Sequence, residues 1–352
     1  MPKPNQKLIA EKLNLSRTTV SRCFTNHPKI NPETRAKVFQ LAAEMGFSYA
    51  QQRNTVSQRD ESERNTIAVI IGAPESVRDA VDTAGRILKG ISEKAANSGL
   101  EIEVHYVNPA EFEVKPRSRK IIKNVSCLNW KGVVLVYNFD ENSVRNIMSK
   151  FPTVSVLEDY HNLDVDCISQ DQVRGISKLV EHLHEIGHRK IGFMSWKYPV
   201  TTPWVERRLG AYVENLFRFD LDLDPELIIN VKKHEFIDQP QLVDEVAKQI
   251  KKGTTAWVCA ADHQAYHLKA ELEKQGFNIP QDCSITGYDG IVPPEGQDQI
   301  TTIRMPFKDI GLSAVSSLIR KMAHPMAKRH NIQISGELKL GESTGTPLAT
   351  AN

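Results

Sequence analysis

Three residues near the N-terminus have the types and the spacing needed for DNA recognition. Ala10, Asn14 and Val20 stand at helix-turn-helix spacing. A small residue lets a second helix pack closely, the turn needs a residue that tolerates positive φ, and a β-branched residue fills the core. Such a module places its second helix in the major groove of DNA. The spacing alone also suits a three-helix module with another role.

The surrounding residues predict three short helices that would hold this turn. Gln6–Leu13 carries apolar residues at helical spacing, and Ser16 is a suitable N-cap for a second helix over Arg17–Phe24. Asn31 precedes a proline and an acidic residue, which predicts a third helix that begins at Pro32. We therefore expect a small all-α head over residues 1–47.

From Thr66 the pattern changes to apolar runs that alternate with amphipathic helical segments. This alternation predicts an α/β fold with doubly wound parallel sheets. About 280 residues is large for one such sheet, so we expect two lobes in a body that extends over 66–345. Between head and body, residues 48–65 are polar and aperiodic, which predicts a linker. The expected strands are Ile67–Ile71, Ile102–Val107, Gly132–Val136, Val154–Leu157, Ile191–Met194, Thr255–Ala260 and Ser284–Tyr288, and the expected helices are Ala84–Ser98, Gly175–Ile186, Glu206–Phe217, Gln241–Lys251 and His263–Gln275.

Charge is distributed unevenly along the chain. Residues 1–59 contain ten Lys and Arg against three acids, whereas the remainder contains 35 against 40. A basic head on a mildly acidic body is typical of a nucleic-acid-binding module joined to a second function. A solvated basic arm is the alternative for this feature taken alone.

Composition excludes several classes of protein. The 352 residues are 40% hydrophobic and 25% charged, as in ordinary globular proteins. The apolar runs fall far short of the roughly 20 residues that span a bilayer, and the N-terminus has no apolar signal core. The five cysteines include no CxxC pair, which indicates reduced thiols. We expect a cytoplasmic protein with no membrane segment, no cofactor and no metal.

Three stretches of the head follow one another in a fixed pattern. They are Leu15–Arg22 (LSRTTVSR), Asn26–Pro28 (NHP) and Asn31–Val38 (NPETRAKV). In order and spacing they resemble the turn, the recognition helix and the third-helix cap in the DNA-binding head of the LacI/GalR family of bacterial repressors. The resemblance covers nearly all of residues 6–47.

The resemblance assigns the DNA contacts mainly to the second helix. It implies that Arg17 and Thr18 reach base edges in the major groove and that Arg22 contacts a base or a phosphate. An arginine can bind guanine O6 and N7 with two hydrogen bonds, and hydroxyls at a helix N-terminus suit phosphates. For Arg17 the alternative is an exposed surface charge. The implied phosphate contacts are Ser16, Thr19, Ser21 and Asn26.

The body resembles the same family more loosely over residues 66–345. This resemblance implies the fold of a periplasmic binding protein, in which two α/β lobes enclose a ligand cleft. One lobe would comprise residues 66–168 with 299–330, and the other 169–298 with 331–345. The matching stretches are Ile67–Ile70, Asp171–Gly175, His182–Ile191, Arg207–Tyr212, Ala256–Ala265, Gly287–Asp289 and Thr301–Pro306.

Four body residues match positions at which the family holds its effector. By this resemblance, Arg207 and Asp289 match the effector-holding pair. Such a pair suits a sugar's hydroxyls or a purine's edge, because a guanidinium supplies forked donors and a carboxylate supplies acceptors. An interlobe salt bridge is the alternative for this pair. Asp171 stands where a second carboxylate often lines the cleft. Phe236 stands where an aromatic ring often stacks on the ligand, and ordinary core packing is its alternative.

The linker departs from the family pattern. Relatives carry a hinge helix whose leucine wedges into the minor groove at the operator centre. Tyr49–Gln58 contains no leucine, and Val56 is its only aliphatic residue apart from Ala50. We therefore expect that the operator is bent little and that its central base pairs matter less than its half-sites.

These features together predict a sequence-specific DNA-binding transcriptional regulator, a repressor by resemblance. It would bind a palindromic double-stranded operator as a homodimer, under the control of a small effector such as a sugar or sugar derivative. The alternative is a sugar-binding protein or sensor without sequence-specific DNA binding. An enzyme is not expected, because GxSxG, P-loop, GxGxxG and HExxH motifs are absent. His182, His184 and His188 do not share a helical face, so no metal site is expected.

Overall fold

The computed structural model describes residues 5–24, 30–45, 65–72, 78–115, 121–122, 130–198, 202–231 and 237–348. The chain forms two compact units. The first comprises Met1–Ser169 and Pro306–Ile334, and the second comprises Gln170–Met305 and Ser335–Asn352. Within the described ranges, no helix is both long and apolar enough to cross a membrane.

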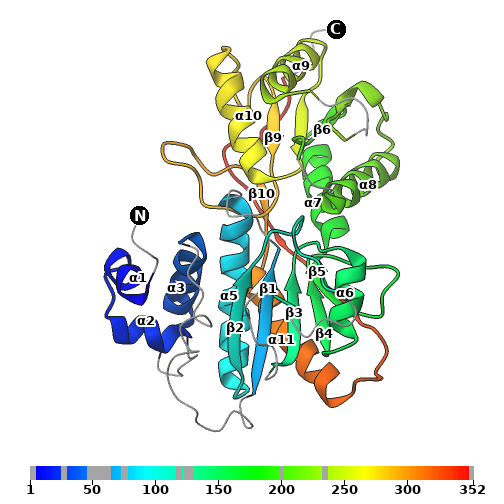
Figure 1. Ribbon diagram of the computed structural model, residues 1–352. Coiled ribbons are helices and arrows are strands. Elements are labelled where there is room, and N and C mark those ends of the chain that lie inside the picture. The colour runs from blue at the N-terminus through cyan, green and yellow to red at the C-terminus, as the bar shows by residue number, and fades with distance from the viewer. Residues whose placement is uncertain are drawn as a thin grey trace. The chain divides into compact units, whose positions relative to one another are not determined.

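The head consists of three helices, as predicted, and belongs to the first unit (Figure 1). Asn14 in the turn has a φ of 52°, which confirms the left-handed conformation expected there. The Ser16 side chain accepts a hydrogen bond from the backbone N–H of Thr19 at 3.0 Å, and that of Asn31 accepts one from Glu33 at 2.8 Å. Both predicted caps are therefore formed. The helices are α1 (Gln6–Lys12), α2 (Arg17–Phe24) and α3 (Pro32–Glu44), and their core consists of Ile9, Ala10, Val20, Cys23, Val38 and Ala42.

The first unit also contains a six-stranded sheet with the strand order β11-β5-β4-β3-β1-β2. Strands β2, β1, β3, β4 and β5 pair in parallel. Strand β1 is buried along its whole length, as expected for a parallel strand covered on both faces. The strands are β1 (Thr66–Ile71), β2 (Glu101–Tyr106), β3 (Trp130–Val136), β4 (Thr153–Val156), β5 (Asp166–Gln170) and β11 (Asn331–Ile334).

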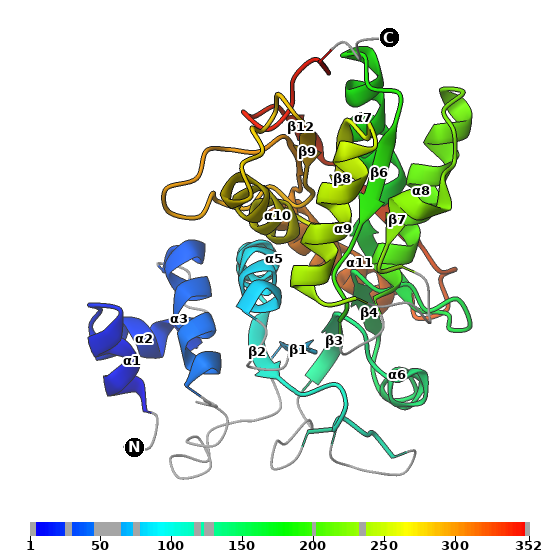
Figure 2. The same ribbon diagram turned by 90° about the horizontal axis from the view of Figure 1, so that it is seen from above.

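Helices cover both faces of this sheet (Figure 2). Helices α5 (Arg78–Asn97) and α11 (Phe307–Ala323) pack on one face, and α6 (Glu141–Met148) packs on the other. Helices α5 and α11 cross closely because glycines stand at the contact. A Cβ on Gly90 would lie 1.9 Å from the carbonyl oxygen of Lys308. A Cβ on Gly311 would lie 2.1 Å from the carbonyl oxygen of an α5 residue.

The second unit is built on a four-stranded parallel sheet with the order β7-β6-β8-β9. Strands β6 and β8 are neighbours, yet the chain continues from them toward opposite edges of the sheet. This arrangement makes the carboxyl ends of β6 and β8 a topological switch point, which is where open α/β sheets bind ligands. The strands are β6 (Ile191–Met194), β7 (Ile228–Ile229), β8 (Ala256–Cys259) and β9 (Ser284–Thr286), with a short 3-10 helix over Pro225–Leu227.

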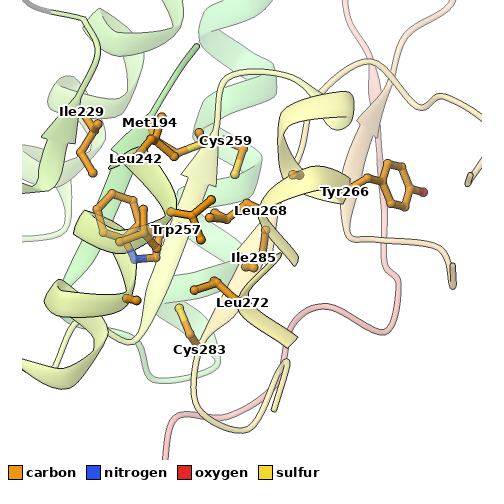
Figure 3. Close-up of a cluster of buried hydrophobic side chains, with 14 of the residues drawn as sticks. Met194, Ile229, Leu242, Trp257, Cys259, Tyr266, Leu268, Leu272, Cys283 and Ile285 are labelled. Carbon is orange, nitrogen blue, oxygen red and sulfur yellow. The ribbon is translucent and has the colours of Figure 1, made fainter. Parts of the chain in front are cut away.

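Two helices cover each face of the second sheet. Tyr212 on α8 donates a hydrogen bond to the carbonyl of Ile191 at 2.7 Å and packs on Phe193. Met194, the next residue of β6, points to the opposite face, where Trp257 and side chains of α9 and α10 form the core shown in Figure 3. The helices are α7 (Gln172–Glu185), α8 (Pro203–Arg218), α9 (Gln239–Lys251) and α10 (Asp262–Lys274).

The expected lobe boundaries are wrong at two places in the C-terminal part of the body. Residues 299–305 belong to the second unit and not to the first, because Thr301 and Arg304 bridge to Thr286 and Asp289 there. Residues 331–334 belong to the first unit, because they form strand β11 beside β5. The chain then returns through β12 (Glu337–Lys339), which pairs antiparallel with β10 (Thr302–Arg304).

Candidate functional site

The outer face of α2 carries the side chains that the sequence assigns to base reading. Arg17, Thr18 and Arg22 are exposed, whereas Val20 and Cys23 on the opposite face are fully buried. Spacings of one and four residues keep the exposed side chains on one side of a helix. The helix therefore presents two guanidinium groups and a hydroxyl to a DNA groove.

The residues assigned to phosphate contacts lie at the start of α2 and within it. The Ser16 hydroxyl lies 2.8 Å from that of Thr19, so the two residues close the N-terminus of the helix together. Ser21 is half-buried on the next turn. Asn26 lies outside the described residues.

A second group of polar side chains lies at the carboxyl end of the second unit's sheet. Its centre is Arg208 on α8, whose Nη2 donates to Asp289 Oδ1 at 3.1 Å. The structure thus places Arg208, the neighbour of the predicted Arg207, against Asp289. Because one helical residue is a rotation of about 100°, the face of α8 that buries Tyr212 also buries Arg208 and leaves Arg207 only half-buried.

The guanidinium of Arg208 is only 2% exposed and is fixed by several partners. Its Nε donates to Gln172 Oε1 at 3.0 Å, its Nη2 also donates to Gln170 Oε1 at 2.8 Å, and its Nη1 donates to the carbonyl of Ala260. Among the described residues, these contacts and the one to Asp289 engage four of the five N–H donors of a guanidinium. The planar fork is thereby held in one orientation, and one of its donors is engaged by no described residue.

Two aromatic rings sandwich this guanidinium. Its central carbon lies 3.7 Å from the ring centroid of Tyr288 and 4.7 Å from that of Trp204. Arginine stacks well on aromatic faces because its charge is delocalised over a plane. Gly175 makes room for this arrangement, since a Cβ there would lie 2.3 Å from the hydroxyl of Tyr288.

Asp289 combines an accessible carboxylate with an unusual backbone conformation. Its side chain is 21% exposed, so part of the carboxylate can accept hydrogen bonds from a ligand. Its φ is 120°, a conformation that costs a non-glycine residue on the order of 1–3 kcal/mol. The loop is held by the buried Asp262, which accepts hydrogen bonds from the backbone of Ile291 at 2.8 Å and from Thr302 Oγ1 at 2.5 Å. Burial, aided by the charge of Asp289, raises the pKa of Asp262 to about 7.

The other two predicted effector residues have different outcomes. Asp171 belongs to the second unit and is the N-cap of α7, where its Oδ1 accepts from the backbone of Arg174 at 3.0 Å. Its Oδ2 accepts from Ser335 Oγ at 3.0 Å. Both oxygens of the Asp171 carboxylate thus accept hydrogen bonds from within the second unit. Phe236 lies outside the described residues.

The sequence interpretation missed several members of this site. Gln170 and Gln172 flank the residue that was chosen, and neither glutamine belongs to a recognised pattern. A signal for Arg208 was present, because Val205, Arg208 and Tyr212 recur at the three- and four-residue spacing of a buried helical face. The interlobe salt bridge considered for the pair is also wrong, because both partners lie in the second unit.

Two histidines in and just after the end of α7 lie within hydrogen-bond distance of the C-terminal segment. His188 is 1% exposed and lies within hydrogen-bond distance of Thr255 Oγ1, Ser284 Oγ and the carbonyl of Gly345. His182 lies 3.1 Å from Thr344 Oγ1. Over the described ranges, no three histidine, cysteine or acidic side chains are grouped so that they could hold a metal ion.

Two stretches of the chain match known protein families. Residues 7–49 match bacterial regulatory proteins of the lacI family, and residues 180–344 match the periplasmic binding protein-like domain. The HTH-type transcriptional repressor CytR of Escherichia coli (strain K12) is 29% identical over 325 residues, which cover 90% of this chain and 89% of CytR.

Solved structures share the fold over nearly the whole chain. The transcriptional regulator CelR in complex with cellobiose has a TM-score of 0.66 at 18% identity, with 97% of this chain and 99% of that chain covered. The lac repressor dimer bound to operator and the anti-inducer ONPF has a TM-score of 0.64 at 18% identity, with the same coverage.

The helix-turn-helix head and the periplasmic-binding-protein-like body define a DNA-binding regulatory protein. The chain belongs to the LacI family of bacterial regulatory proteins, and it is a transcriptional regulator. This family consists of regulators and not of enzymes.

Proposed function

We propose that this chain is a dimeric repressor whose affinity for its operator is controlled by a small effector. The observation that carries the proposal is the exposed face of α2, on which Arg17, Thr18 and Arg22 stand opposite a buried core. The chain acts by binding and not by catalysis, as the regulators that it resembles do. Operator binding places its work in the cytoplasm, where bacterial DNA lies.

A dimer is proposed because one head is too small to find an operator alone. A single recognition helix covers one half-site, and useful affinity requires two heads at a fixed spacing. A twofold dimer would bind a palindromic operator, because the symmetry of the DNA mirrors that of the protein. The lac repressor structure with which this chain shares its fold is a dimer on its operator, which supports the same assembly here.

The effector is proposed to bind at the carboxyl end of the second sheet. Arg208 offers one donor in a fixed plane, and the carboxylate of Asp289 offers acceptors. A matched donor and acceptor of this kind suit the hydroxyls of a sugar or sugar derivative. The cellobiose held by CelR supports this class of ligand.

The test is selection of binding sites from a random double-stranded DNA library with the full chain. We expect an inverted repeat of two half-sites, protected as one footprint. Arg17→Ala should weaken binding to that operator about 5- to 150-fold, which corresponds to about 1–3 kcal/mol, and relax the preference for one base pair in each half-site. Arg17→Lys is the matched variant, because it keeps the charge and loses the planar fork.

Arg17→Lys should therefore bind random DNA like the wild type and lose selectivity for the operator. Recovery of no common sequence from the library would overturn the proposal in favour of a sugar-binding protein without a DNA target. Equal losses for Arg17→Ala on operator and on random DNA would show that this residue does not read bases.

A further inference from the structure

At the switch point lies a buried glutamine, Gln264. Only one end of its side-chain amide has hydrogen-bond partners among the described residues. Gln264 lies in the first turn of α10, directly after β8, and its side chain is 0% exposed. One end of the amide lies 2.7 Å from the hydroxyl of Tyr198 and 3.4 Å from that of Ser195, which follows β6. The side chain therefore spans the carboxyl ends of β6 and β8, where open α/β sheets bind ligands.

The other end of the Gln264 amide has no hydrogen-bond partner among the described residues. Buried polar groups in native proteins are nearly always paired, so an exception calls for an explanation. The two ends of an amide differ only in being donor or acceptor. In either orientation of the amide, a hydroxyl group can complete it, because a hydroxyl both donates and accepts.

A second buried polar atom nearby also lacks a hydrogen-bond partner among the described residues. Trp196 follows Ser195, and its indole Nε1 is buried without a partner in the described part of the chain. An indole N–H is a donor only and needs an acceptor. The ring stands edge to face with His263, at 4.9 Å between centroids, and His263 Nε2 lies 2.9 Å from the hydroxyl of Tyr198. The two incomplete groups therefore belong to one cluster.

Aromatic rings continue from this cluster to the arginine already described. The ring of Tyr198 lies 5.6 Å from that of Trp204, which in turn stacks on Arg208. Aromatic faces offer a large apolar surface, and the polar tips of tyrosine and tryptophan orient a ligand that stacks on them. The apolar face of a sugar ring and its hydroxyl edge match these two features.

We propose that Gln264 and Trp196 form a second effector subsite that binds hydroxyl groups of a sugar ring stacked against Tyr198 and Trp204. This inference rests on the proposed effector site and extends it from the Arg208–Asp289 pair to the switch point itself. The ligand chemistry is that of neighbouring ring hydroxyls, which a free sugar and the ribose of a nucleoside share.

The test measures binding to the full chain by calorimetry, with D-ribose, cellobiose and cytidine as probes. 2-Deoxy-D-ribose and 2′-deoxycytidine serve as the matching analogues that lack one hydroxyl. We expect at least one hydroxyl-bearing probe to bind the wild-type protein. Gln264→Met and Trp196→Phe should each weaken that binding roughly 3- to 10-fold, the effect of one lost hydrogen bond. A response to ribose identifies a free sugar as the source, and a response to cytidine alone identifies a nucleoside.

Gln249→Met is the matched control. Gln249 is equally buried in the same unit, but it lies near the end of α9, where it donates to Glu245 at 2.8 Å. This variant should bind the probes like the wild type. Affinities that are unchanged in Gln264→Met would overturn the proposal and leave a trapped water as the partner of the amide. Failure of all three probes to bind would overturn it too.

The proposed function is tested separately in the same preparations. Selection of an operator and its dependence on Arg17 involve the head and not Gln264. A protein that binds its operator and whose probe affinity responds to Arg208→Gln but not to Gln264→Met keeps the proposed function and loses only this subsite.

Discussion

At the scale of single residues, Arg208 is fixed by its own chain before any ligand arrives. Four of its donors bind described residues of the same unit, and two aromatic rings enclose its plane. A ligand that meets such a group encounters a donor already in place, so little conformational entropy is lost on binding. The adjacent Arg207 has the same charge but is only half-buried on a different face of α8.

This difference predicts that exchanging one arginine or the other has unequal effects. Arg208→Gln should abolish the stabilisation of the protein by sugar probes in thermal-shift measurements, because it costs the ligand about 1–3 kcal/mol and leaves Asp289 without its partner. Arg207→Gln should leave that shift within error of the wild type. Operator affinity without effector should be close to normal in both variants. The same loss in both would contradict the placement of the site around Arg208.

His188 predicts a pH dependence of stability. Burial lowers its pKa to about 4 from an ordinary value of 6.5. The unfolded chain therefore takes up this proton first as the pH falls, so stability is fully present above about pH 6.5 and is lost between pH 6.5 and 4. The loss attributable to this residue is roughly 3 kcal/mol.

The measurement compares urea midpoints at pH 7.5 and at pH 5. His188→Gln removes the titration, so on going from pH 7.5 to pH 5 its midpoint should fall less, or rise more, than that of the wild type. His161→Gln, at an exposed histidine of the first unit, is the control and should follow the wild type. Identical pH profiles for His188→Gln and the wild type would exclude a contribution from this histidine. Variant and wild type must be compared directly, because the raised pKa of Asp262 acts with the opposite sign.

At the scale of elements, hydrophobic patterning predicted the long apolar strands and missed a strand whose buried residues are partly polar. All seven expected strands formed, because continuous runs of aliphatic residues are typical of parallel strands. Strand β5 was missed, since it begins with Asp166 and ends with Ser169 and Gln170. Asp166 is fully buried and accepts a hydrogen bond from Ser317 on α11, a partner 151 residues away that no local pattern reveals.

The same limit applied to the candidate site. Asp289 was predicted from a local motif. Gln264 and Gln170 can be recognised as members of the site only once β6, β8 and α8 are packed together. In the head, the caps, the turn and the exposed face depend on residues that are close in sequence, so all three could be predicted.

Replacing either of two helical glycines by alanine should change the melting temperature, in opposite directions for the two positions. Alanine ordinarily stabilises a helix interior by about 1 kcal/mol relative to glycine. Gly210 on α8 has no atom within 4 Å of a Cβ position, so Gly210→Ala should raise the melting temperature. At Gly90 a Cβ would collide with backbone of α11, so Gly90→Ala should cost about 1–3 kcal/mol and lower the melting temperature. Stabilisation by both substitutions would show that α5 and α11 do not cross closely.

At the scale of the whole molecule, regulation requires that effector binding and operator binding are coupled by a free energy. If an effector changes operator affinity by a given factor, operator must change effector affinity by the same factor. The two sites lie in different units, since α2 belongs to the first and Arg208 to the second. Titrating a bound sugar probe in the presence and absence of operator measures this factor directly.

The segment that joins head and body gives the last prediction, which concerns the operator. Tyr49–Gln58 lies outside the described residues, so the prediction rests on its composition, which includes no leucine. Unstacking a base step costs a few kcal/mol, and a large apolar side chain wedged into the minor groove offsets this cost. Val56 is short and β-branched and offers little surface for such a wedge.

We therefore expect the selected operator to be bent little. Changes at its central base pairs should alter affinity less than changes in either half-site, where each mismatch costs about 1–3 kcal/mol. A circular-permutation assay with the selected operator measures the bend, and Val56→Leu is the variant that adds a wedge. This variant should increase both the bend and the dependence on the central step, because leucine supplies the surface that valine lacks. A strong central kink in the wild-type complex, unchanged in Val56→Leu, would show that the operator is deformed by contacts other than a wedge from this segment.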